Sequence, residues 1–218
     1  MFKQNGLMVS VILRNRNEED YIGFSIQSVV EHIPDAEILV IDNNSTDDSM
    51  QIVNLFSDRI KISTFSINDY SPGSSLNFGV SKCSFDKVLI LSAHSQITKL
   101  NLDSVFNSLL DHSAVFGKQT PIYKGKKIST RYIWSHFKDS QEVNMFSNIE
   151  NRQFLHNAFC FYNKHNLQSH PFDENLAGKE DRYWAIDAVK RSDSYLYDPN
   201  LQCNHFYTKN GATWKGIG

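Results

Sequence analysis

The sequence predicts a single α/β domain in which a mostly parallel central sheet is flanked by helices. Between Val9 and Ser49 it reads, in order, as an apolar run, a polar turn, a helical pattern, and a second apolar run that ends in an acidic turn. That order is typical of a β-α-β unit, whose polar turns lie past the carboxyl ends of neighbouring strands, where open α/β sheets bind ligands. The length of 218 residues, 40% of them hydrophobic, suits one domain with a well-buried core. We therefore expect a ligand site at this edge of the sheet.

The first helix is predicted to run from Ile22 to Ile33. Asn17 followed by three acidic residues is a helix-start signal, because a side-chain oxygen can cap free N–H groups and negative charge favours that end of the helix dipole. Apolar residues then recur at helical spacing, and Pro34 ends the run. In the same way, Ser45 with an acidic residue three positions on predicts the start of a second helix.

The rest of this half continues the alternation of strands and helices. Apolar runs, amphipathic patterns and turn residues predict a strand at 60–65, a helix at 76–81, a strand at 87–91, a helix at 102–110 and a strand that begins at 114–116.

The alternation is lost after about residue 117. The segment up to residue 172 is rich in aromatic residues, His and Asn without a clean period, and a clear helical pattern returns only at 180–191. We expect residues 1–117 to form the first half of the domain, and residues 118–218 to form a mixed half that shapes a pocket.

The composition excludes several classes of protein. The net charge is −2 and the densest basic stretch, 124–127, is short, so nucleic acid is not an expected partner. No segment approaches the roughly 20 apolar residues of a membrane-spanning helix, and the N-terminus lacks the core of a signal peptide, so we expect a soluble, cytoplasmic protein. Three widely spaced cysteines are expected to be reduced.

Five pieces of the chain together carry a family resemblance. They are VSVILRNRNEEDY, EILVIDNNSTDDS, SSLNFGVSKC, VLILSAHS, and PFDENLAGKEDRYWA followed by a C-terminal His. In this order they resemble the family 2 glycosyltransferases of the GT-A fold. Arg14, where many members have Pro, and the Ser-Ala-His strand end are similar to a bacterial rhamnosyltransferase-like subgroup. The resemblance implies inverting transfer of a sugar from a nucleotide-diphosphate sugar to a hydroxyl of a glycan, in synthesis of a bacterial capsule, lipopolysaccharide or O-antigen.

The resemblance implies a donor site at the first two strand ends. Asp42 matches the acidic residue that contacts the nucleoside in the family, although it equally suits a turn cap. Arg offers a planar donor fork, so Arg14 and Arg16, with Asn15 between them, are expected to contact the base or the diphosphate. The other donor-site candidates are Glu18, Asn77, Ser92 and His94.

The expected metal site departs from the family pattern. Family members commonly have two Asp residues at the end of the VLIL-like strand, and the second holds Mg²⁺ or Mn²⁺ against the diphosphate. Here Ser92 and His94 take those positions. Hard cations prefer oxygen ligands, whereas imidazole is acceptable to Mn²⁺. Two alternatives stay open: His94, with His205, ligates a divalent ion, or His94 hydrogen-bonds the leaving diphosphate directly.

The catalytic base is expected in the KEDRYWA piece. Inverting transfer needs a carboxylate that takes the proton of the acceptor hydroxyl, and Asp181 matches the base of the family. Glu180 is the adjacent carboxylate. Both residues also suit the first turn of a helix. Trp184 has two interpretations, stacking on the acceptor sugar or packing in the core.

Two residues of the middle segment are candidates for acceptor binding. Gln119 lies in a piece that resembles a G-R-Q-x-P stretch of the subgroup, and Asn157 follows His156 where the subgroup tends to have Ser-Asn. Amide side chains suit the hydroxyls of a sugar.

The expected partners are a nucleotide-sugar donor and a glycan or glycolipid acceptor. We expect the protein to be soluble or peripherally bound, and to act at the inner face of the membrane. One rival is a catalytically silent subunit that binds a nucleotide or glycan. A second is a sugar-1-phosphate nucleotidyltransferase, which needs a Gly-rich first loop that RNRNEED does not provide. The oligomeric state stays open.

Overall fold

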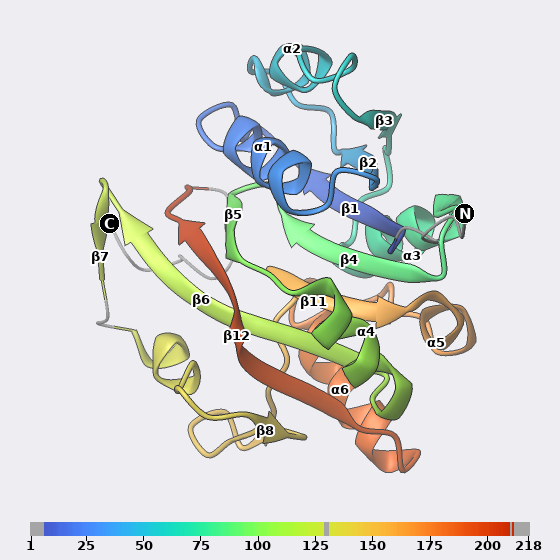
Figure 1. Ribbon diagram of the computed structural model, residues 1–218, viewed down its shortest axis with the longest axis vertical. Helices are drawn as coiled ribbons and strands as arrows, with labels where there is room; N and C mark the ends of the chain where they lie inside the picture. The colour runs from blue at the N-terminus through green and yellow to red at the C-terminus, as the bar shows by residue number, and fades with distance from the viewer. Residues whose placement is uncertain (1–6, 129–130, 210, 212–218) are drawn as a thin grey trace, which may run out of the picture.

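The computed structural model describes residues 7–128, 131–209 and 211. It confirms the predicted α/β domain, with one large mixed sheet whose strands follow the order β3-β2-β1-β4-β11-β6-β12-β5 (Figure 1). The first four strands of this path are parallel to one another. They are β1 (Val9–Asn15), β2 (Glu37–Asp42), β3 (Lys61–Ser66) and β4 (Lys87–Ser92).

The central strands β1 and β2 are buried almost throughout, as is typical of parallel strands covered on both faces. Their register brings the predicted site residues to one edge of the sheet. Asn15 pairs with Asp42 at the ends of β1 and β2, and Arg14 pairs with Ser92 at the ends of β1 and β4.

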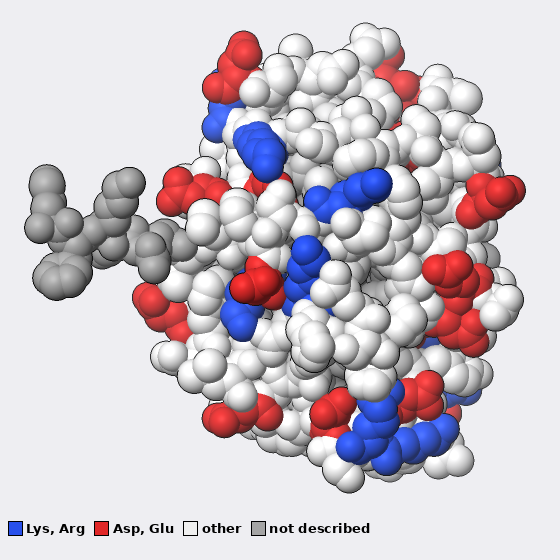
Figure 2. Space-filling view, turned by 90° about the vertical axis from the view of Figure 1, so that its right-hand side faces the viewer, with Lys and Arg blue, Asp and Glu red and all other residues white. Residues whose placement is uncertain are grey.

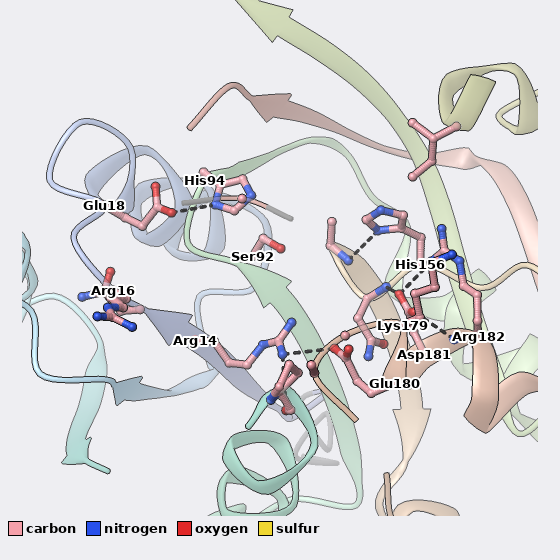
Figure 3. Close-up of a pocket in the computed structure, with 18 of the residues that line it drawn as sticks. Arg14, Arg16, Glu18, Ser92, His94, His156, Lys179, Glu180, Asp181 and Arg182 are labelled. Atoms are coloured by element: carbon pink, nitrogen blue, oxygen red, sulfur yellow. Dashed lines mark hydrogen bonds and ion pairs between the residues drawn. The ribbon is translucent and has the colours of Figure 1, made fainter. Parts of the chain in front are cut away.

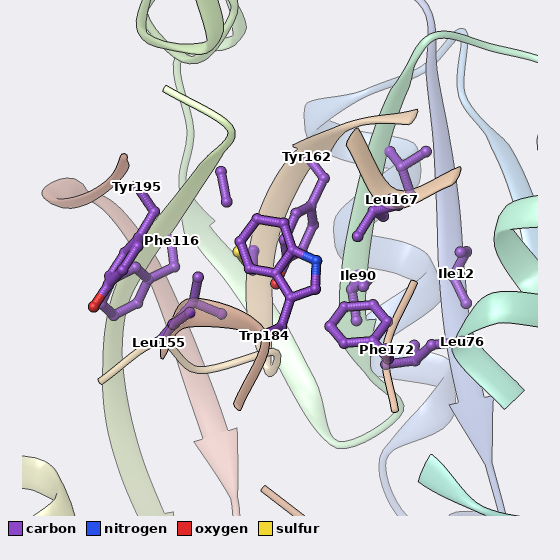
Figure 4. Close-up of a cluster of buried hydrophobic side chains, with 14 of the residues drawn as sticks. Ile12, Leu76, Ile90, Phe116, Leu155, Tyr162, Leu167, Phe172, Trp184 and Tyr195 are labelled. Atoms are coloured by element: carbon purple, nitrogen blue, oxygen red, sulfur yellow. The ribbon is translucent and has the colours of Figure 1, made fainter. Parts of the chain in front are cut away.

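Helices cover both faces of the sheet, and each face has its own apolar core. On one face lie α1 (Ile22–His32), α2 (Ser49–Asn54) and α4 (Leu102–Asp111). On the other lie α3 (Pro72–Lys82), α5 (Lys164–Ser169) and α6 (Glu180–Lys190). In the second core, Trp184 of α6 packs with Tyr162 and Phe172 (Figure 4).

The second half of the chain extends the sheet with antiparallel and parallel strands. Strand β11 (Phe159–Asn163) is antiparallel to both β4 and β6 (Ala114–Tyr123), and β12 (Tyr195–Phe206) runs parallel to β6 and antiparallel to β5 (Ser95–Lys99). Short elements complete this half: β7 (Lys126–Lys127), β8 (Glu142–Val143), β9 (Phe146–Ser147), β10 (Arg152–Gln153) and the 3₁₀ helix Tyr132–His136.

The two predicted helix-start signals are wrong. Helix α1 begins at Ile22 with no side-chain cap, and Asn17 has a left-handed φ of 53° with its Oδ1 accepting the backbone N–H of Thr46 at 2.7 Å. Helix α2 begins only at Ser49, and the Ser45 hydroxyl instead donates to Asp42 Oδ1 at 2.6 Å. Both polar side chains join the first two loops to each other instead of capping a helix.

The surface and the cysteines agree with the composition. On the face shown in Figure 2, acidic and basic side chains are interspersed without an extended area of one sign. Cys83, Cys160 and Cys203 are free and buried. None of the helices in the described part of the chain is long and apolar enough to cross a membrane.

Candidate active site

A cavity of about 700 Å³ opens at the carboxyl ends of β1 and β4 (Figure 3). Its walls come from the loop after β1, the end of β4, the segment before β11 and the first turn of α6. The structure therefore brings together residues from both halves of the chain. The sequence-predicted residues that line the cavity are Arg14, Asn15, Arg16, Glu18, Ser92, His94, Asn157, Glu180 and Asp181.

Asp181 is held in a fixed orientation in the first turn of α6. Its Oδ1 accepts the backbone N–H of Arg182 at 2.8 Å, and its Oδ2 accepts Arg182 Nη1 at 2.8 Å and the backbone N–H of Asn157 at 3.1 Å. A carboxylate has about four acceptor positions. These bonds leave one of them, on Oδ1, to accept a proton from a ligand in the cavity.

Glu180 forms an ion pair with Arg14 across the cavity. Arg14 Nη1 lies 3.0 Å from Glu180 Oε1 and 3.3 Å from the carbonyl oxygen of Pro72. Burial raises the pKa of Glu180, and the neighbouring Asp181 raises it further, while Arg14 opposes both effects. For Arg14, burial lowers the pKa, but the attractions of Glu180, Tyr70 and Asp181 together outweigh it, so the net pKa is raised. The guanidinium therefore stays charged beside the cavity.

Glu18 and His94 form a second pair at the end of β4. His94 Nδ1 lies 3.2 Å from Glu18 Oε1, and the Thr208 hydroxyl donates to the same oxygen at 3.2 Å. Only 6% of the Glu18 side chain and 13% of the His94 side chain are exposed.

His205 contacts the His94 ring and does not line the cavity. Their ring centroids are 4.9 Å apart, and His205 is 1% exposed with its Nδ1 2.8 Å from Gln119 Oε1. An amide oxygen only accepts, so His205 Nδ1 carries a proton. Burial, with His94 and His156 nearby, lowers the pKa of His205 well below its usual value. Among the described residues, His94 and His205 belong to no group of three or more side chains that could hold a metal ion.

The chemistry of these donors does not fit the metal site that the family pattern implies. Within the described residues, no group of three or more His, Cys, Asp or Glu side chains is placed to hold a metal ion. At the end of β4 the chain offers the Ser92 hydroxyl and an imidazole whose Nδ1 already faces Glu18. A hard cation such as Mg²⁺ prefers carboxylate and other oxygen ligands.

Two donor-site candidates do not line the cavity. Asp42 accepts hydrogen bonds from the Ser45 backbone N–H at 2.9 Å, from the Ser45 hydroxyl, and from Asn15 Nδ2 at 2.8 Å. Asp42 therefore has the turn-cap role, which was the alternative to nucleoside binding. Asn77 lies in α3, where its Nδ2 donates to the carbonyl oxygen of Phe172 and its Oδ1 accepts the backbone N–H of the same residue, so it tethers the loop before α6.

Two acceptor-site candidates are also outside the cavity. Gln119 is an interior residue of β6, 2% exposed, where it bonds His205. Trp184 is 4% exposed and donates from Nε1 to the carbonyl oxygen of His170 at 2.9 Å, so it belongs to the core. Asn157 does line the cavity, and its Oδ1 accepts the Tyr162 hydroxyl at 2.7 Å.

Sequence reasoning missed four charged residues of the cavity wall, which are Arg131, Glu150, Lys179 and Arg182. Arg182 is 4% exposed, bonds Asp181 and lies 4.2 Å above the Phe154 ring; its place next to Asp181 in the sequence was a signal. Glu150 lies 3.8 Å from Arg182 and 3.6 Å from Lys179. Glu150 sits in an irregular segment, and no motif marked it.

These observations define the class of protein. Residues 10–170 match the model of glycosyl transferase family 2, so the chain belongs to this family. In structure it is similar to TarS of S. aureus in complex with UDP-GlcNAc, with a TM-score of 0.74 and 19% identity over 97% of this chain and 62% of that chain. The complex of TarS with UDP gives a TM-score of 0.71 and 20% identity over 92% and 61% of the two chains. The likeness confirms the expected GT-A fold.

Two curated proteins are also similar in sequence. The minor teichoic acid biosynthesis protein GgaA of Bacillus subtilis is 29% identical over 187 residues, which are 80% of this chain and 41% of that protein. The GalNAc(5)-diNAcBac-PP-undecaprenol beta-1,3-glucosyltransferase of Campylobacter jejuni is 24% identical over 194 residues, 87% and 62% of the two chains. The chain thus spans less than two thirds of either relative, and neither supports the rhamnosyltransferase-like subgroup.

Proposed function

We propose that this chain is an inverting glycosyltransferase that moves a sugar from a nucleotide-diphosphate donor to a hydroxyl of a bacterial surface glycan. The observation that carries the proposal is the position of Asp181. Its carboxylate lines the cavity at the carboxyl ends of β1 and β4, is oriented by three hydrogen bonds, and stands beside the Arg14–Glu180 pair. Ligands of open α/β sheets bind at this edge.

In the proposed reaction the acceptor oxygen attacks the anomeric carbon of the donor sugar. The new C–O bond forms on the face opposite the bond to the diphosphate, which breaks and leaves as the nucleoside diphosphate. Asp181 takes the proton of the acceptor hydroxyl. Arg14, at the end of β1, supplies positive charge and hydrogen bonds to the leaving phosphates.

The names of the relatives favour a uridine nucleotide and a cell-wall acceptor. TarS was crystallised with UDP and with UDP-GlcNAc, and GgaA is named for teichoic acid biosynthesis. As part of the proposal we extend the nucleotide and the class of acceptor to this chain. UDP is then the first nucleotide to test, and a teichoic acid or related surface glycan is the first acceptor to test. A rhamnosyl donor has no support from these relatives.

The first test is nucleotide binding, measured as the thermal shift of the purified protein with UDP, GDP, dTDP and CMP. A ligand at 100 times its dissociation constant stabilises the folded state by about 2.7 kcal/mol, which raises the melting temperature of a chain of this size by roughly 5–10 °C. We expect UDP to give this shift and CMP to give a smaller one. The absence of a shift with every nucleotide would contradict the proposed function.

A further inference from the structure

We propose that Glu18 orients His94 so that its imidazole hydrogen-bonds the diphosphate of the donor, at the position where the family carries a metal-binding carboxylate. Glu18 is then a positioning residue, and His94 is the group that contacts the donor. The inference rests on the proposed function, since it names the groups that hold the leaving diphosphate.

The two residues reach the cavity from different parts of the fold. Glu18 lies in the loop between β1 and α1, and His94 lies in the turn between β4 and β5. Figure 3 shows the two side chains facing each other at the cavity wall, with His94 Nδ1 3.2 Å from Glu18 Oε1. Both residues line the cavity.

This ion pair orients the ring, with Nδ1 as the nitrogen nearest to Glu18 Oε1. A carboxylate only accepts hydrogen bonds, so in the proposal His94 Nδ1 carries a proton. The other nitrogen, Nε2, is left to meet a ligand, because the bond made by one ring nitrogen determines the role of the other. In the proposal Nε2 donates to a phosphate oxygen of the donor, while Nδ1 stays directed at Glu18 Oε1.

Glu18 is itself held in place, so it can act as an orienting group. Its backbone N–H donates to Ser49 Oγ at 2.8 Å, and the Thr208 hydroxyl donates to Oε1. Only 6% of its side chain is exposed. A carboxylate so shielded from water is costly unless a partner compensates its charge, and His94 is that partner.

Two further imidazoles lie near His94, and one of them, His156, also lines the cavity. The ring centroids of His94 and His205 are 4.9 Å apart, and those of His205 and His156 are 5.7 Å apart. Burial lowers the pKa of both His156 and His205 well below the usual value, so both are neutral at neutral pH. Arg14 then provides the second hydrogen-bonding cation for the diphosphate.

The test compares a nucleoside diphosphate with its nucleoside by titration calorimetry in EDTA. The probes are UDP and uridine, or GDP or dTDP with the matching nucleoside if one of these gives the larger thermal shift. Glu18→Gln and His94→Gln are each expected to weaken the diphosphate about tenfold or more, because a hydrogen bond to a charged group is lost, and to leave the nucleoside within about twofold. Unchanged nucleoside affinity shows that the variants are folded.

Two further variants sharpen the result. Asp20→Asn removes a carboxylate from the same loop at an exposed position outside the cavity, and is expected to bind both probes like the parent protein. His94→Asp restores the carboxylate of the family pattern, so its diphosphate affinity should fall in EDTA and recover with Mn²⁺.

The outcomes separate this inference from the proposed function. If the parent protein binds the diphosphate only with Mn²⁺, or if Glu18→Gln and His94→Gln bind it as tightly as the parent protein, the assignment of the Glu18–His94 pair is overturned and the proposed function stands. If the parent protein binds no nucleoside diphosphate, the proposed function fails together with the inference.

Discussion

Arg14 Nη1 lies 3.0 Å from Glu180 Oε1, so one ion pair joins the end of β1 to the first turn of α6. Arg14 belongs to the first half expected at residues 1–117, and Glu180 belongs to the mixed half expected at residues 118–218. Because Asp181 follows Glu180 directly, this pair fixes the distance between the proposed base and the donor site.

Removing one partner of this pair is expected to destabilise the fold. Arg14→Met leaves the Glu180 carboxylate, 6% exposed, without its cation, and we expect the free energy of unfolding at pH 7 to fall by about 2–4 kcal/mol. The double variant Arg14→Met/Glu180→Gln should recover part of that loss, because it no longer buries an unpaired charge. Urea denaturation of both variants checks the prediction, and equal stability of the two would contradict it.

The raised pKa of Glu180 gives a pH dependence of known sign. Burial raises this pKa above its usual 4.5, so the folded state binds the proton more tightly than the unfolded state. The contribution of Glu180 to stability is therefore full below pH 4.5 and is lost as the pH rises through the raised value. The difference in unfolding free energy between the parent protein and Glu180→Gln should decrease over this range. A difference that grows with pH would show that Arg14 dominates instead.

Glu37 is expected to behave in the opposite way. Although its burial alone would raise the pKa, bonds from Lys61, Ser10 and Ser84 lower it to about 2. Its stabilising effect is then present above pH 4.5 and disappears as the pH falls towards 2. Glu37→Gln should cost about 2–3 kcal/mol at pH 7 and almost nothing near pH 2. Denaturation curves at several pH values test this, and a cost independent of pH would exclude the mechanism.

The Tyr162 hydroxyl is expected to hold the amide of Asn157. Tyr162 is fully buried, burial raises its pKa well above the usual value, and its hydroxyl donates to Asn157 Oδ1 at 2.7 Å. Tyr162→Phe removes only that donor and should lower the unfolding free energy by about 1–2 kcal/mol. Tyr183→Phe, on the exposed side of α6, is the matched control and should change it by less than about 0.5 kcal/mol. A thermal melt of each variant decides between these outcomes.

The parallel half of the fold could be predicted because its signals are local. Apolar runs and helical spacing place β1, β4 and α4 within a residue or two of their observed bounds. Strand β12 was missed because Asp198, Pro199 and Asn200 interrupt its pattern, while the pairing with β6 that stabilises it depends on a distant segment.

Site residues could be predicted where a sequence motif marks them. They could not be predicted where their position depends on side chains far away in the sequence. Asp181 and Arg14 line the cavity as their motifs indicate. The turn-cap bonds of Asp42 with Ser45 were one of the two alternatives that the sequence left open. The bonds of Asn77 with the backbone before α6 could not be read from the sequence, because they join segments far apart along the chain. The partner of His94 was also unknown until the loop that carries Glu18 was placed.

The most direct test of the proposed function is the rate of nucleoside diphosphate release by the parent protein and by Asp181→Asn. The substrate is UDP-GlcNAc or whichever donor sugar is turned over fastest, with a surface glycan added as acceptor. Asp187→Asn, at an exposed position of the same helix, serves as the control. We predict that Asp181→Asn lowers the rate by about 10²–10⁴-fold with UDP affinity within twofold, while Asp187→Asn keeps the parent rate. Turnover by Asp181→Asn at the parent rate would contradict the assignment of Asp181 as the base.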